Sequence, residues 1–498
     1  MSGQSGPVQW YSAGGGMRDR VIGIDVGTTS VKAVMLGLDG RRLAAFSAPY
    51  PTSRPGSGRV EQDPQDWLRL VQAALAQFAE VAGGEVAAIC VTSQVNTHVF
   101  ADRALEVLHP AIVWQDGRAA AAGAAIDAQV SVAQKVDWLG APIPVDASHA
   151  LARMGWMQAA HPEIWARTAH VLLPRDWIVA RLTGVLACDP MSSVGLVTPG
   201  LDYAAGLIDL VPGAAGRLVP LADPQTVVGQ VGAAWPFAGV PVVLGMMDAW
   251  ASLFGLGVAR QGEGMYLSGT SEVLGVVSAQ VVAEPGVIVF PDWRGVRFHA
   301  GPTQSGGASL DWVARMVGRE PDAALAMAAE VAEDAPLFLP HLAGERAPIW
   351  DAASRGGFAG LSGGTGPAEM VTAVLEGVAF SARLAFEALE RSGAARVAVI
   401  RAGGGGFASD LWAQMRADVF GRPLCRVAGR DPGAVGAAVM AGAGIGLMAD
   451  LATAAGALVQ TDRVFEPREE AAARAERRYA IWRGMYGALR PINHALVG

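Results

Sequence analysis

The chain has 498 residues, of which 51% are hydrophobic and 17% are charged, and its net charge is −8. This composition is typical of a compact folded protein, and the length fits two large α/β halves or roughly three domains. The acidic balance, without a basic stripe, argues against a nucleic-acid partner. The two lysines are Lys32 and Lys135. Because neither follows a glycine, a Walker-A phosphate loop is excluded.

The cysteines, the N-terminal segment and the most apolar segment bear on the cellular location of the protein. Cys90, Cys188 and Cys425 lie far apart in the sequence, which predicts neither a disulfide framework nor a metal-ligand cluster and favours a cytoplasmic location. Residues 1–19 lack the charged-then-apolar order of a signal peptide, and we expect a disordered extension or a tag there. The segment 433–448 is too short to span a bilayer, so it predicts a buried helix and no membrane partner.

In its first half the chain alternates strands and helices, which predicts an α/β domain. Asp63 followed by Pro64 marks a helix start, with Asp as the N-cap and Pro at the first helical position. The strands are expected at 21–25, 31–36, 42–47, 86–91 and 241–245. The other helices are expected at 118–129, 150–159, 176–182 and from Asp248 onward.

The pattern restarts in the second half. A strand at 264–268, the turn Gly269-Thr270-Ser271 and a strand at 273–277 repeat the order seen around Gly27-Thr28-Thr29. We infer an internal duplication, with an N-terminal domain at 20–258 and a C-terminal domain at 259–498. The remaining elements are expected as helices from 308, from 321, at 367–389 and at 409–420, a strand at 397–401, and a terminal helix.

Each glycine–threonine turn offers backbone N–H groups and hydroxyl donors to phosphate oxygens. At the first turn, Gly27, Thr28 and Thr29 follow Asp25, a carboxylate that can orient Mg²⁺ or its waters. Gly269 and Thr270 form the second turn. We expect the two turns to hold one polyphosphate between them, which removes the need for a phosphate-loop lysine.

Two further segments are candidates for ligand binding and for proton transfer. The run Gly403 to Gly406 lies between a strand and a helix, where a base or ribose can approach the backbone, although a plain connector is the alternative. Asp248 opens a helix after a strand and can accept a proton from a hydroxyl, although a simple N-cap is equally compatible with the local sequence.

Several motifs in this order resemble the FGGY carbohydrate kinases, and most of all their xylulokinase branch. They are the string Asp25 to Lys32, the run Trp114-Gln115-Asp116-Gly117-Arg118, the run Leu339 to Pro348, and the glycine loop that leads into Leu411-Trp412. The resemblance covers the chain from about Arg20 onward. It implies two duplicated actin-like ATPase domains with ribonuclease-H-like cores and a cleft between them. It also implies ATP and Mg²⁺ as cofactors and a small sugar or polyol as substrate, with the last helix packing back on the first domain. A homodimer is left open.

The resemblance assigns residue roles by motif position. Asp248 matches the general base, and Asp25 is the candidate metal ligand. The nucleotide residues are Gly27, Thr28, Thr29, Gly269, Thr270, Gly403, Gly404 and Gly405. The sugar contacts are Gln94, Val95, Asn96, Trp114, Asp116 and Trp250. Turn or cap chemistry is the alternative interpretation for Asn96 and Asp116.

The departures from the family pattern lie near the expected sugar site. Asn96 stands where a histidine is usual, although His98 lies two residues on, and Ala249 stands where an asparagine usually follows the base. The run Cys188 to Ser192 also differs. We therefore expect a xylulokinase-like kinase for a small sugar, with a pentulose as the first candidate, and a preference for a different or shorter sugar than D-xylulose.

Three alternatives stay open at this point. The first is a polyol kinase of the erythritol, ribitol or glycerol type. The second is a nucleotide-gated sugar-binding regulator without turnover, against which the presence of Asp248 argues. A nicotinamide-dependent dehydrogenase is disfavoured, because the glycine loop comes late and lacks the dinucleotide spacing.

Overall fold

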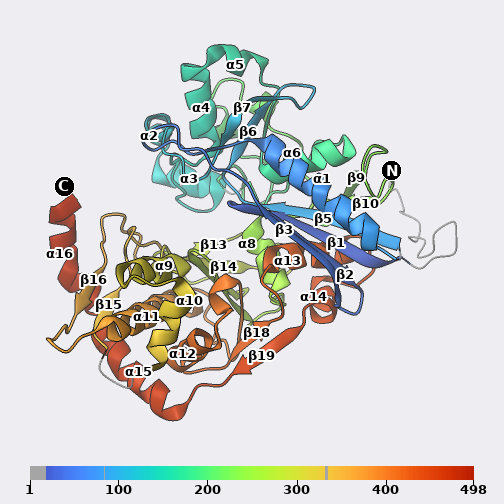
Figure 1. Cartoon of the computed structure of the whole chain (residues 1–498). Coiled ribbons are helices and arrows are strands. Elements are labelled where there is room, and N and C mark those ends of the chain that lie inside the picture. The colour runs from blue at the N-terminus through green and yellow to red at the C-terminus, as the bar shows by residue number, and fades with distance from the viewer. Residues whose placement is uncertain (1–17, 84, 194, 331–334, 498) are drawn as a thin grey trace. The chain divides into compact units, whose positions relative to one another are not determined.

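The computed structural model describes residues 18–83, 85–193, 195–330 and 335–497 (Figure 1). Among these residues the chain forms two compact units. The first comprises the described residues up to Gly255 together with Gly433–Leu458, and the second comprises Leu256–Pro432 and the described residues from Val459 onward. The late segment Gly433–Leu458 therefore belongs to the first unit.

The first unit is built on a six-stranded sheet in the order β3-β2-β1-β5-β10-β9. The pairs β1–β2, β2–β3 and β9–β10 are antiparallel, whereas β5 is parallel to both β1 and β10. The strands are β1 (Arg18–Val26), β2 (Ser30–Gly37), β3 (Arg42–Pro49), β5 (Glu85–Ser93), β9 (Val227–Gln230) and β10 (Pro241–Val243).

Helices cover both faces of this sheet, and β1 shows why. Successive side chains of a strand point to opposite faces. Ile22, Ile24 and Val26 belong to the core cluster that contains the apolar face of α1 (Pro64–Val81). On the other face, Gly23 lies so close to α13 (Pro432–Gly444) that a Cβ atom would be 1.9 Å from the Ala434 carbonyl oxygen.

Helix α13 is rich in glycine and alanine because its neighbours touch its backbone. A Cβ atom on Gly436 would lie 1.6 Å from the carbonyl oxygen of Ala251 in α8 (Asp248–Gly255). In Figure 1, α13 and α14 (Leu451–Leu458), in the orange-red of late residues, lie beside the blue strands of the first unit. Tight packing of this kind requires residues without side chains at the contact points.

A smaller layer completes the first unit. A four-stranded sheet in the order β4-β7-β6-β8 and several short helices enclose a second core that includes Leu151, Met154 and Leu207. The strands are β4 (Glu61–Gln62), β6 (His98–Ala101), β7 (Val107–Ile112) and β8 (His170–Leu172). The helices of this layer are α2 (Ala120–Asp127), α3 (Val132–Leu139), α4 (Ala150–Ala160), α5 (Pro162–Arg167), α7 (Ala205–Ile208) and η1 (Ala215–Arg217). Helix α6 (Pro174–Thr183) instead packs Trp177 and Ile178 into the core of the main sheet.

The second unit repeats the plan with a seven-stranded sheet in the order β13-β14-β12-β11-β17-β18-β19. The pairs β11–β12, β12–β14 and β18–β19 are antiparallel, whereas β17 is parallel to both β11 and β18. Its strands are β11 (Gly264–Ser268), β12 (Glu272–Val277), β13 (Ile288–Val289), β14 (Phe298–Pro302), β17 (Ile400–Gly403), β18 (Leu424–Val427) and β19 (Thr461–Phe465). The pairing of β14-β12-β11-β17-β18 thus matches that of β3-β2-β1-β5-β10, which supports the inferred duplication.

The long helix α11 (Pro367–Ser392) forms the centre of the second unit. Residues of α11 belong to two core clusters of this unit, one with Tyr266 and Leu274 from the sheet and one with Val313 from α9 (Gly307–Met316). The other elements are α9 (Gly307–Met316), α10 (Pro321–Met327), η2 (Ala328–Glu330), β15 (Leu337–Leu339), β16 (Gly357–Ala359), η3 (Gly405–Phe407), α12 (Asp410–Phe420), α15 (Glu469–Trp482) and α16 (Met485–Val497).

One sequence-based expectation about the chain ends was wrong. Arg18 and Asp19, placed in the expected extension, begin β1, while residues 1–17 lie outside the described residues. The last helix, α16, belongs to the second unit, where Tyr486 donates a hydrogen bond to Asp351. The expectation that this helix packs back on the first domain stays a prediction. The expected helix at 433–448 exists as α13. The division of functions between the two units stays a prediction.

Within the part of the chain that the structure describes, no helix is long and apolar enough to cross a membrane.

The close approach of α13 to α8 predicts a large effect of one methyl group. Gly436→Ala should lower the free energy of unfolding of the first unit by at least about 1–3 kcal/mol, because the new Cβ meets backbone atoms that cannot rotate away. Urea denaturation followed by circular dichroism measures the change.

The matched control is Gly456→Ala in α14, where a Cβ would have no neighbour within 4 Å. That variant should be neutral or stabilised by up to about 1 kcal/mol, the helix-propensity difference between the two residues. Equal denaturation midpoints for the two variants would contradict the proposed packing.

Candidate active site

Three polar segments of the first unit meet at one edge of its main sheet. Strands β1, β5 and β10 are parallel neighbours, so their carboxyl ends share an edge. The backbone pairing continues to that edge, because Ser93 is paired with both Val26 and Met247. The segments at this edge are Gly27–Thr29 after β1, Gln94–Asn96 after β5, and the stretch to Asp248 after β10. The edge of a parallel sheet therefore brings together residues that are more than 200 positions apart.

The first glycine–threonine turn is held by side chains from other segments. The Gly27 N–H donates to the Ser30 carbonyl at 3.1 Å and closes the turn. The Thr28 carbonyl accepts from Gln62 at 2.7 Å, and the Thr28 hydroxyl accepts from the Trp114 indole at 3.1 Å. Tyr50 donates to the Gly27 carbonyl. The Thr28 hydroxyl keeps its own proton for a ligand, since it only accepts from Trp114.

Gln94 acts as a link inside this edge. Its side chain is 1% exposed, donates to Gln62 at 2.8 Å and accepts from the Thr97 hydroxyl at 3.1 Å. Its backbone N–H donates to the Val26 carbonyl at 3.0 Å. Gln94 therefore connects the segment after β5 to the turn after β1, and the structure gives it a positioning role where we expected a sugar contact.

Asp25, the candidate metal ligand, lies near the end of β1 and is half-buried. A Cβ atom on Gly433 would lie 2.4 Å from Asp25 Oδ2, so the glycine at the start of α13 leaves the space that this carboxylate occupies. The described residues contain no cluster of three or more histidine, cysteine or acidic side chains suited to a metal. Mg²⁺ commonly uses only one or two carboxylates plus waters and phosphate oxygens, so a single carboxylate fits that ion.

Asp248 is the first residue of α8, and its Oδ1 accepts from the Ala249 N–H at 2.8 Å. Burial raises the pKa of Asp248 to about 6, while the N–H groups at the helix start oppose that shift. The backbone before it is fixed, since the Thr92 hydroxyl donates to the Met246 carbonyl at 2.6 Å. A carboxylate with this pKa can accept a proton near neutral pH and release it again.

A buried arginine that the sequence analysis missed joins this edge to the loop before β9. Arg175 in α6 is 1% exposed, pairs with Asp176 and Asp189, and donates to the Gly245 carbonyl at 2.9 Å. Burial alone would lower the pKa of this guanidinium, but the two carboxylates raise it well above the usual value. The adjacent charges Arg175-Asp176 at a helix start are the one signal that could have revealed the site.

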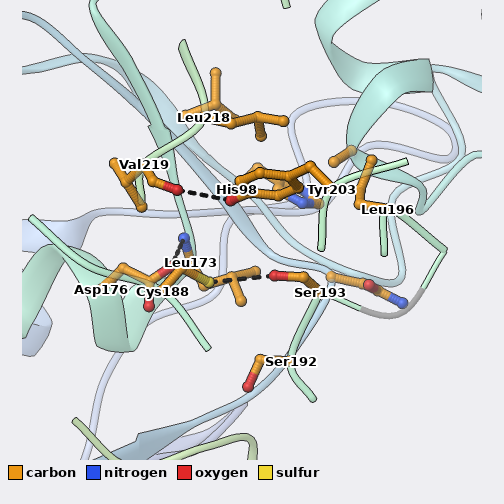
Figure 2. A pocket seen from close by; sticks show the side chains of 13 residues that line it. His98, Leu173, Asp176, Cys188, Ser192, Ser193, Leu196, Tyr203, Leu218 and Val219 are labelled. Carbon is orange, nitrogen blue, oxygen red and sulfur yellow. Dashed lines mark hydrogen bonds between the residues drawn. The ribbon is translucent and has the colours of Figure 1, made fainter. Parts of the chain in front are cut away.

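Figure 2 shows a small cavity next to this edge, lined by Asn96 and His98 together with residues from α4, β8, α6 and the loops around Cys188 and Val219. Asn96 has a positive φ of 55°, which asparagine tolerates better than most residues. Val95 packs against the main core of the unit. Of the expected sugar contacts, Asn96 faces the cavity and Trp114 contacts Thr28.

Two expected sugar contacts are not accessible in this structure. Asp116 is 1% exposed, and its two oxygens accept hydrogen bonds from Val60 and Arg118, with the ion pair to Arg118 at 2.7 Å. This arrangement matches the alternative interpretation of Asp116 as a residue that fixes its own turn. Trp250 is 0% exposed and packs beside Phe254 in α8. We therefore leave both residues out of the proposed sugar site.

In the second unit, the turn Gly269–Thr270 follows β11 and is exposed. The Gly269 N–H donates to the Ser271 carbonyl at 2.9 Å. The carbonyls of Gly269 and Thr270 accept from Gly307 at 2.8 Å and Ala308 at 3.1 Å, at the start of α9. A Cβ on Gly307 would lie 2.8 Å from the Gly269 carbonyl, so this contact requires glycine. The first turn of α9 thus supports the glycine–threonine turn.

The glycine loop lies at the same edge of the second sheet. Strand β17 is the parallel neighbour of β11, with Leu267 opposite Gly403, so the loop and the turn follow adjacent carboxyl ends. Gly404 has φ of 92°, and a Cβ there would lie 2.4 Å from the Ser268 carbonyl oxygen. Gly405 has nothing within 4 Å of the Cβ position. The backbone at Gly405 is therefore open to a flat ligand, whereas Gly404 is required by the turn itself.

A second buried arginine holds this edge together. Arg416 donates to Ser268 at 3.0 Å, to Glu272 at 2.8 Å and to the Gly406 carbonyl at 2.8 Å. Burial raises the pKa of Glu272 to about 7, although the charge of Arg416 opposes that shift. Both side chains are 0% exposed. The sequence analysis missed this pair because its members lie 144 positions apart.

The two edges offer different chemistry. The edge of the first unit has a carboxylate with a pKa near neutrality and uncharged polar groups that can bind hydroxyls. The edge of the second unit has an exposed turn and an open glycine backbone, whose N–H groups can bind phosphate and a nucleoside. The structure thus groups Gly27, Thr28, Thr29, Gln94, Asn96 and Asp248 in one unit and Gly269, Thr270, Gly403, Gly404 and Gly405 in the other.

Comparison with known proteins finds relatives that match most of the chain. The chain is 32% identical over 435 residues to a xylulose kinase of Escherichia coli, covering 84% of this chain and 89% of that protein. It is 30% identical over 497 residues to a glycerol kinase of Gloeobacter violaceus, covering 95% of this chain and 97% of that protein. A crystal structure of ligand-bound xylulose kinase from Lactobacillus acidophilus is similar with a TM-score of 0.85 at 26% identity, covering 95% of this chain and 98% of that chain.

Both halves of the chain match domains of one family. Residues 20–255 match the N-terminal domain of the FGGY family of carbohydrate kinases, and residues 264–445 match its C-terminal domain. These matches cover most of the chain, and they agree with the duplicated α/β sheets and with the actin-like ATPase fold expected from the sequence. The chain therefore belongs to the FGGY family of carbohydrate kinases, and it is a sugar-kinase phosphotransferase of the xylulokinase-like type.

Proposed function

We propose that this kinase transfers the γ-phosphoryl group of ATP to a primary hydroxyl of a small, uncharged sugar or polyol, with Asp248 as the general base. The observation that carries the proposal is the position of Asp248. This carboxylate, with a pKa of about 6, follows β10 at the same sheet edge as Gln94–Asn96 and Gly27–Thr29. A base must lie beside the hydroxyl that it deprotonates, and this edge supplies polar groups for a polyhydroxylated molecule.

The chemistry needs little from the protein beyond placement and one proton transfer. The acceptor hydroxyl oxygen attacks the γ-phosphorus, the bond from that phosphorus to the β–γ bridging oxygen breaks, and ADP leaves. Asp248 accepts the hydroxyl proton. The Thr92 and Arg175 contacts to the carbonyls of Met246 and Gly245 fix the backbone in front of α8, which holds the carboxylate in one orientation.

The nucleotide is assigned to the glycine-rich segments. Gly269 and Thr270 form an exposed turn whose Thr270 hydroxyl can donate to a phosphate, and we assign Gly403, Gly404 and Gly405 to the adenosine, with the open backbone at Gly405. We assign Gly27, Thr28 and Thr29 to phosphate oxygens as well, since Thr28 keeps a hydroxyl proton to donate. Asp25 is the residue that would hold Mg²⁺ or its waters, and the ion would neutralise charge on the phosphates.

The acceptor class is inferred from the relatives and from the cavity. The xylulose kinase and glycerol kinase relatives are named for a ketose and for a polyol, both uncharged. A pentulose is our first candidate, and a polyol of the erythritol, ribitol or glycerol type is the second. The presence of the carboxylate Asp248 at this edge argues for turnover and against a sugar-binding regulator.

The cellular location and the oligomeric state of the enzyme stay predictions. Cys90, Cys188 and Cys425 are free and buried, which fits the proposed reducing cytoplasm. A homodimer, which the resemblance left open, stays open.

A panel of pentuloses, hexuloses and polyols, assayed by coupled detection of ADP with Mg²⁺ and ATP, tests the function. We expect turnover with at least one pentulose or polyol, and we expect Asp248→Asn to reduce kcat on that substrate at least ~100-fold, the usual scale for loss of a general base.

The Asn variant keeps the size and the hydrogen-bonding capacity of the side chain, so it should fold and bind ATP as the wild type does. Circular dichroism and calorimetric ATP titration check this. Turnover of the Asn variant within a few-fold of the wild type would remove Asp248 from the base role, and no turnover of the wild type with any member of the panel would remove the proposed function.

The raised pKa of Asp248 predicts a pH dependence. The carboxylate accepts a proton only when it is ionised, so kcat/KM for the sugar should be level above pH 7 and fall with acidification through a pKa of about 6. The fall should approach about tenfold per pH unit, because one proton is involved. Initial rates between pH 5 and 8 at saturating ATP measure it. A profile that stays level down to pH 5 would contradict the assignment.

The assignment of the second turn predicts a selective effect on ATP. Thr270→Val removes the hydroxyl but keeps the shape, and it should raise the KM for ATP about tenfold to a hundredfold, which corresponds to one hydrogen bond to a charged group, about 1.5–3 kcal/mol. The KM for the sugar should change less. Thr270→Ser, which keeps the hydroxyl, is the matched control. The assignment fails if the sugar KM rises more than the ATP KM.

A further inference from the structure

A buried arginine fixes which nitrogen of His98 carries the proton. Arg153 in α4 is 0% exposed, and its Nη1 lies 3.1 Å from His98 Nδ1 and shares a proton with it, because the same nitrogen also donates to two carbonyls. Arginine has donors only, so Nδ1 must accept and cannot carry a proton. The neutral ring then has its proton on Nε2. The same guanidinium donates to the carbonyls of Asn96, Ile112 and Val113, so it cannot move away from the ring without breaking those bonds.

His98 stays in this neutral form. Burial lowers its pKa well below the usual value, and the charges of Arg153 and His149 lower it further. A protonated ring would place an N–H against the guanidinium and a positive charge beside another one. His98 therefore presents one fixed donor, the Nε2–H group, and no charge.

The cavity of Figure 2 has few groups left for a ligand. His98 is 5% exposed and lines it together with Asn96. Tyr203 uses its hydroxyl proton on the Val219 carbonyl at 2.8 Å, and Asp176 accepts from Leu173 and Arg175. Within the described residues, the Asn96 side chain and His98 Nε2 have no partner inside the protein. They are therefore polar groups of this cavity that a ligand can satisfy.

The cavity also excludes a class of ligand. Its lining residues, as far as the structure describes them, include no lysine or arginine. Their one carboxylate, Asp176, is already paired with Arg175. A sugar acid would bring an unpaired negative charge into this place, which is costly. The lining suits the hydroxyl and carbonyl oxygens of an uncharged sugar.

We propose that His98 determines acceptor specificity by donating a hydrogen bond from Nε2 to one oxygen of the uncharged acceptor, with its tautomer set by Arg153. His98 thus supplies a donor two residues beyond Asn96, on the strand β6 that borders the cavity. Arg153 is a positioning residue in this arrangement, since it acts through the ring. The inference rests on the proposed function, because it assigns the acceptor to the edge that holds Asp248.

Two substitutions separate the two nitrogens. His98→Asn places an amide near Nδ1, so its oxygen can still accept from Arg153 while the donor at Nε2 is lost. His98→Gln reaches the Nε2 position with an amide N–H but gives Arg153 a poorer acceptor. We expect the Asn variant to lose about threefold to tenfold in kcat/KM for the sugar, the scale of one hydrogen bond, with the KM for ATP unchanged. The Gln variant should keep kcat/KM within about threefold of the wild type and melt at a lower temperature.

A purely structural role for His98 gives the opposite pattern. The Asn variant would then keep its sugar kinetics, and the Gln variant would lose stability and sugar kinetics together. Either result overturns the inference. A set of monodeoxy analogues of the best substrate gives an independent check. One analogue should reduce kcat/KM of the wild type by the same factor as His98→Asn, and should reduce that of the Asn variant little further.

The inference and the proposed function can fail separately. Stabilisation of the wild type by the sugar alone, measured as a melting-temperature shift without ATP, reports acceptor binding independently of turnover. Turnover in the panel together with equal sugar-induced shifts for wild type and His98→Asn rejects the inference and keeps the function. If no member of the panel is turned over or shifts the melting temperature, both are rejected.

Discussion

Parallel pairing of a central strand with two neighbours is the constraint on which both candidate sites depend. In the first unit β5 pairs in parallel with β1 and β10, and in the second β17 pairs in parallel with β11 and β18. Each arrangement sends the loops after neighbouring strands to one edge of the sheet. Residues as distant in sequence as Gly27 and Asp248 come to one sheet edge for this reason, and the same rule brings the turn at Gly269 and the loop at Gly403 to one edge of the second sheet.

Buried arginines stabilise the loops at these edges, and the low lysine content of the chain makes them the available cations. Arg175 fixes the backbone before Asp248, Arg416 joins Ser268 to the Gly406 carbonyl, and Arg153 orients His98. A buried guanidinium is costly unless its donors are satisfied, and each of these three donates to several acceptors. Removing one acceptor would leave a buried charge poorly compensated, so such sites tolerate little movement.

The two units share a strand order but differ in the residues at the carboxyl ends of the strands. Asp248 comes five positions after β10, at the start of α8, whereas β17 is followed by a glycine loop. β18 is also followed by an acidic residue, Asp431, directly before α13. The duplicated sheet therefore provides two frames of the same geometry, and the frame of the first unit holds the proposed base while that of the second holds the glycine loop. A transferase for two unlike substrates needs such a difference.

The sequence alone determined the central strands of both sheets, the duplicated glycine–threonine turns, the family and the candidate base, because these depend on local patterns: alternating apolar residues, turn residues and short motifs. It did not predict shorter strands such as β6, β9 and β18, whose local pattern is weak. It could not determine that α13 joins the first unit, that Asp116 and Trp250 are inaccessible, or that Arg416 pairs with Glu272. Those facts depend on which distant segments touch. The proton position on His98 is of the same kind, since only the folded chain brings Arg153 within hydrogen-bonding distance of Nδ1. Local propensity depends on neighbouring residues, whereas burial and pairing between distant residues arise only when the chain packs.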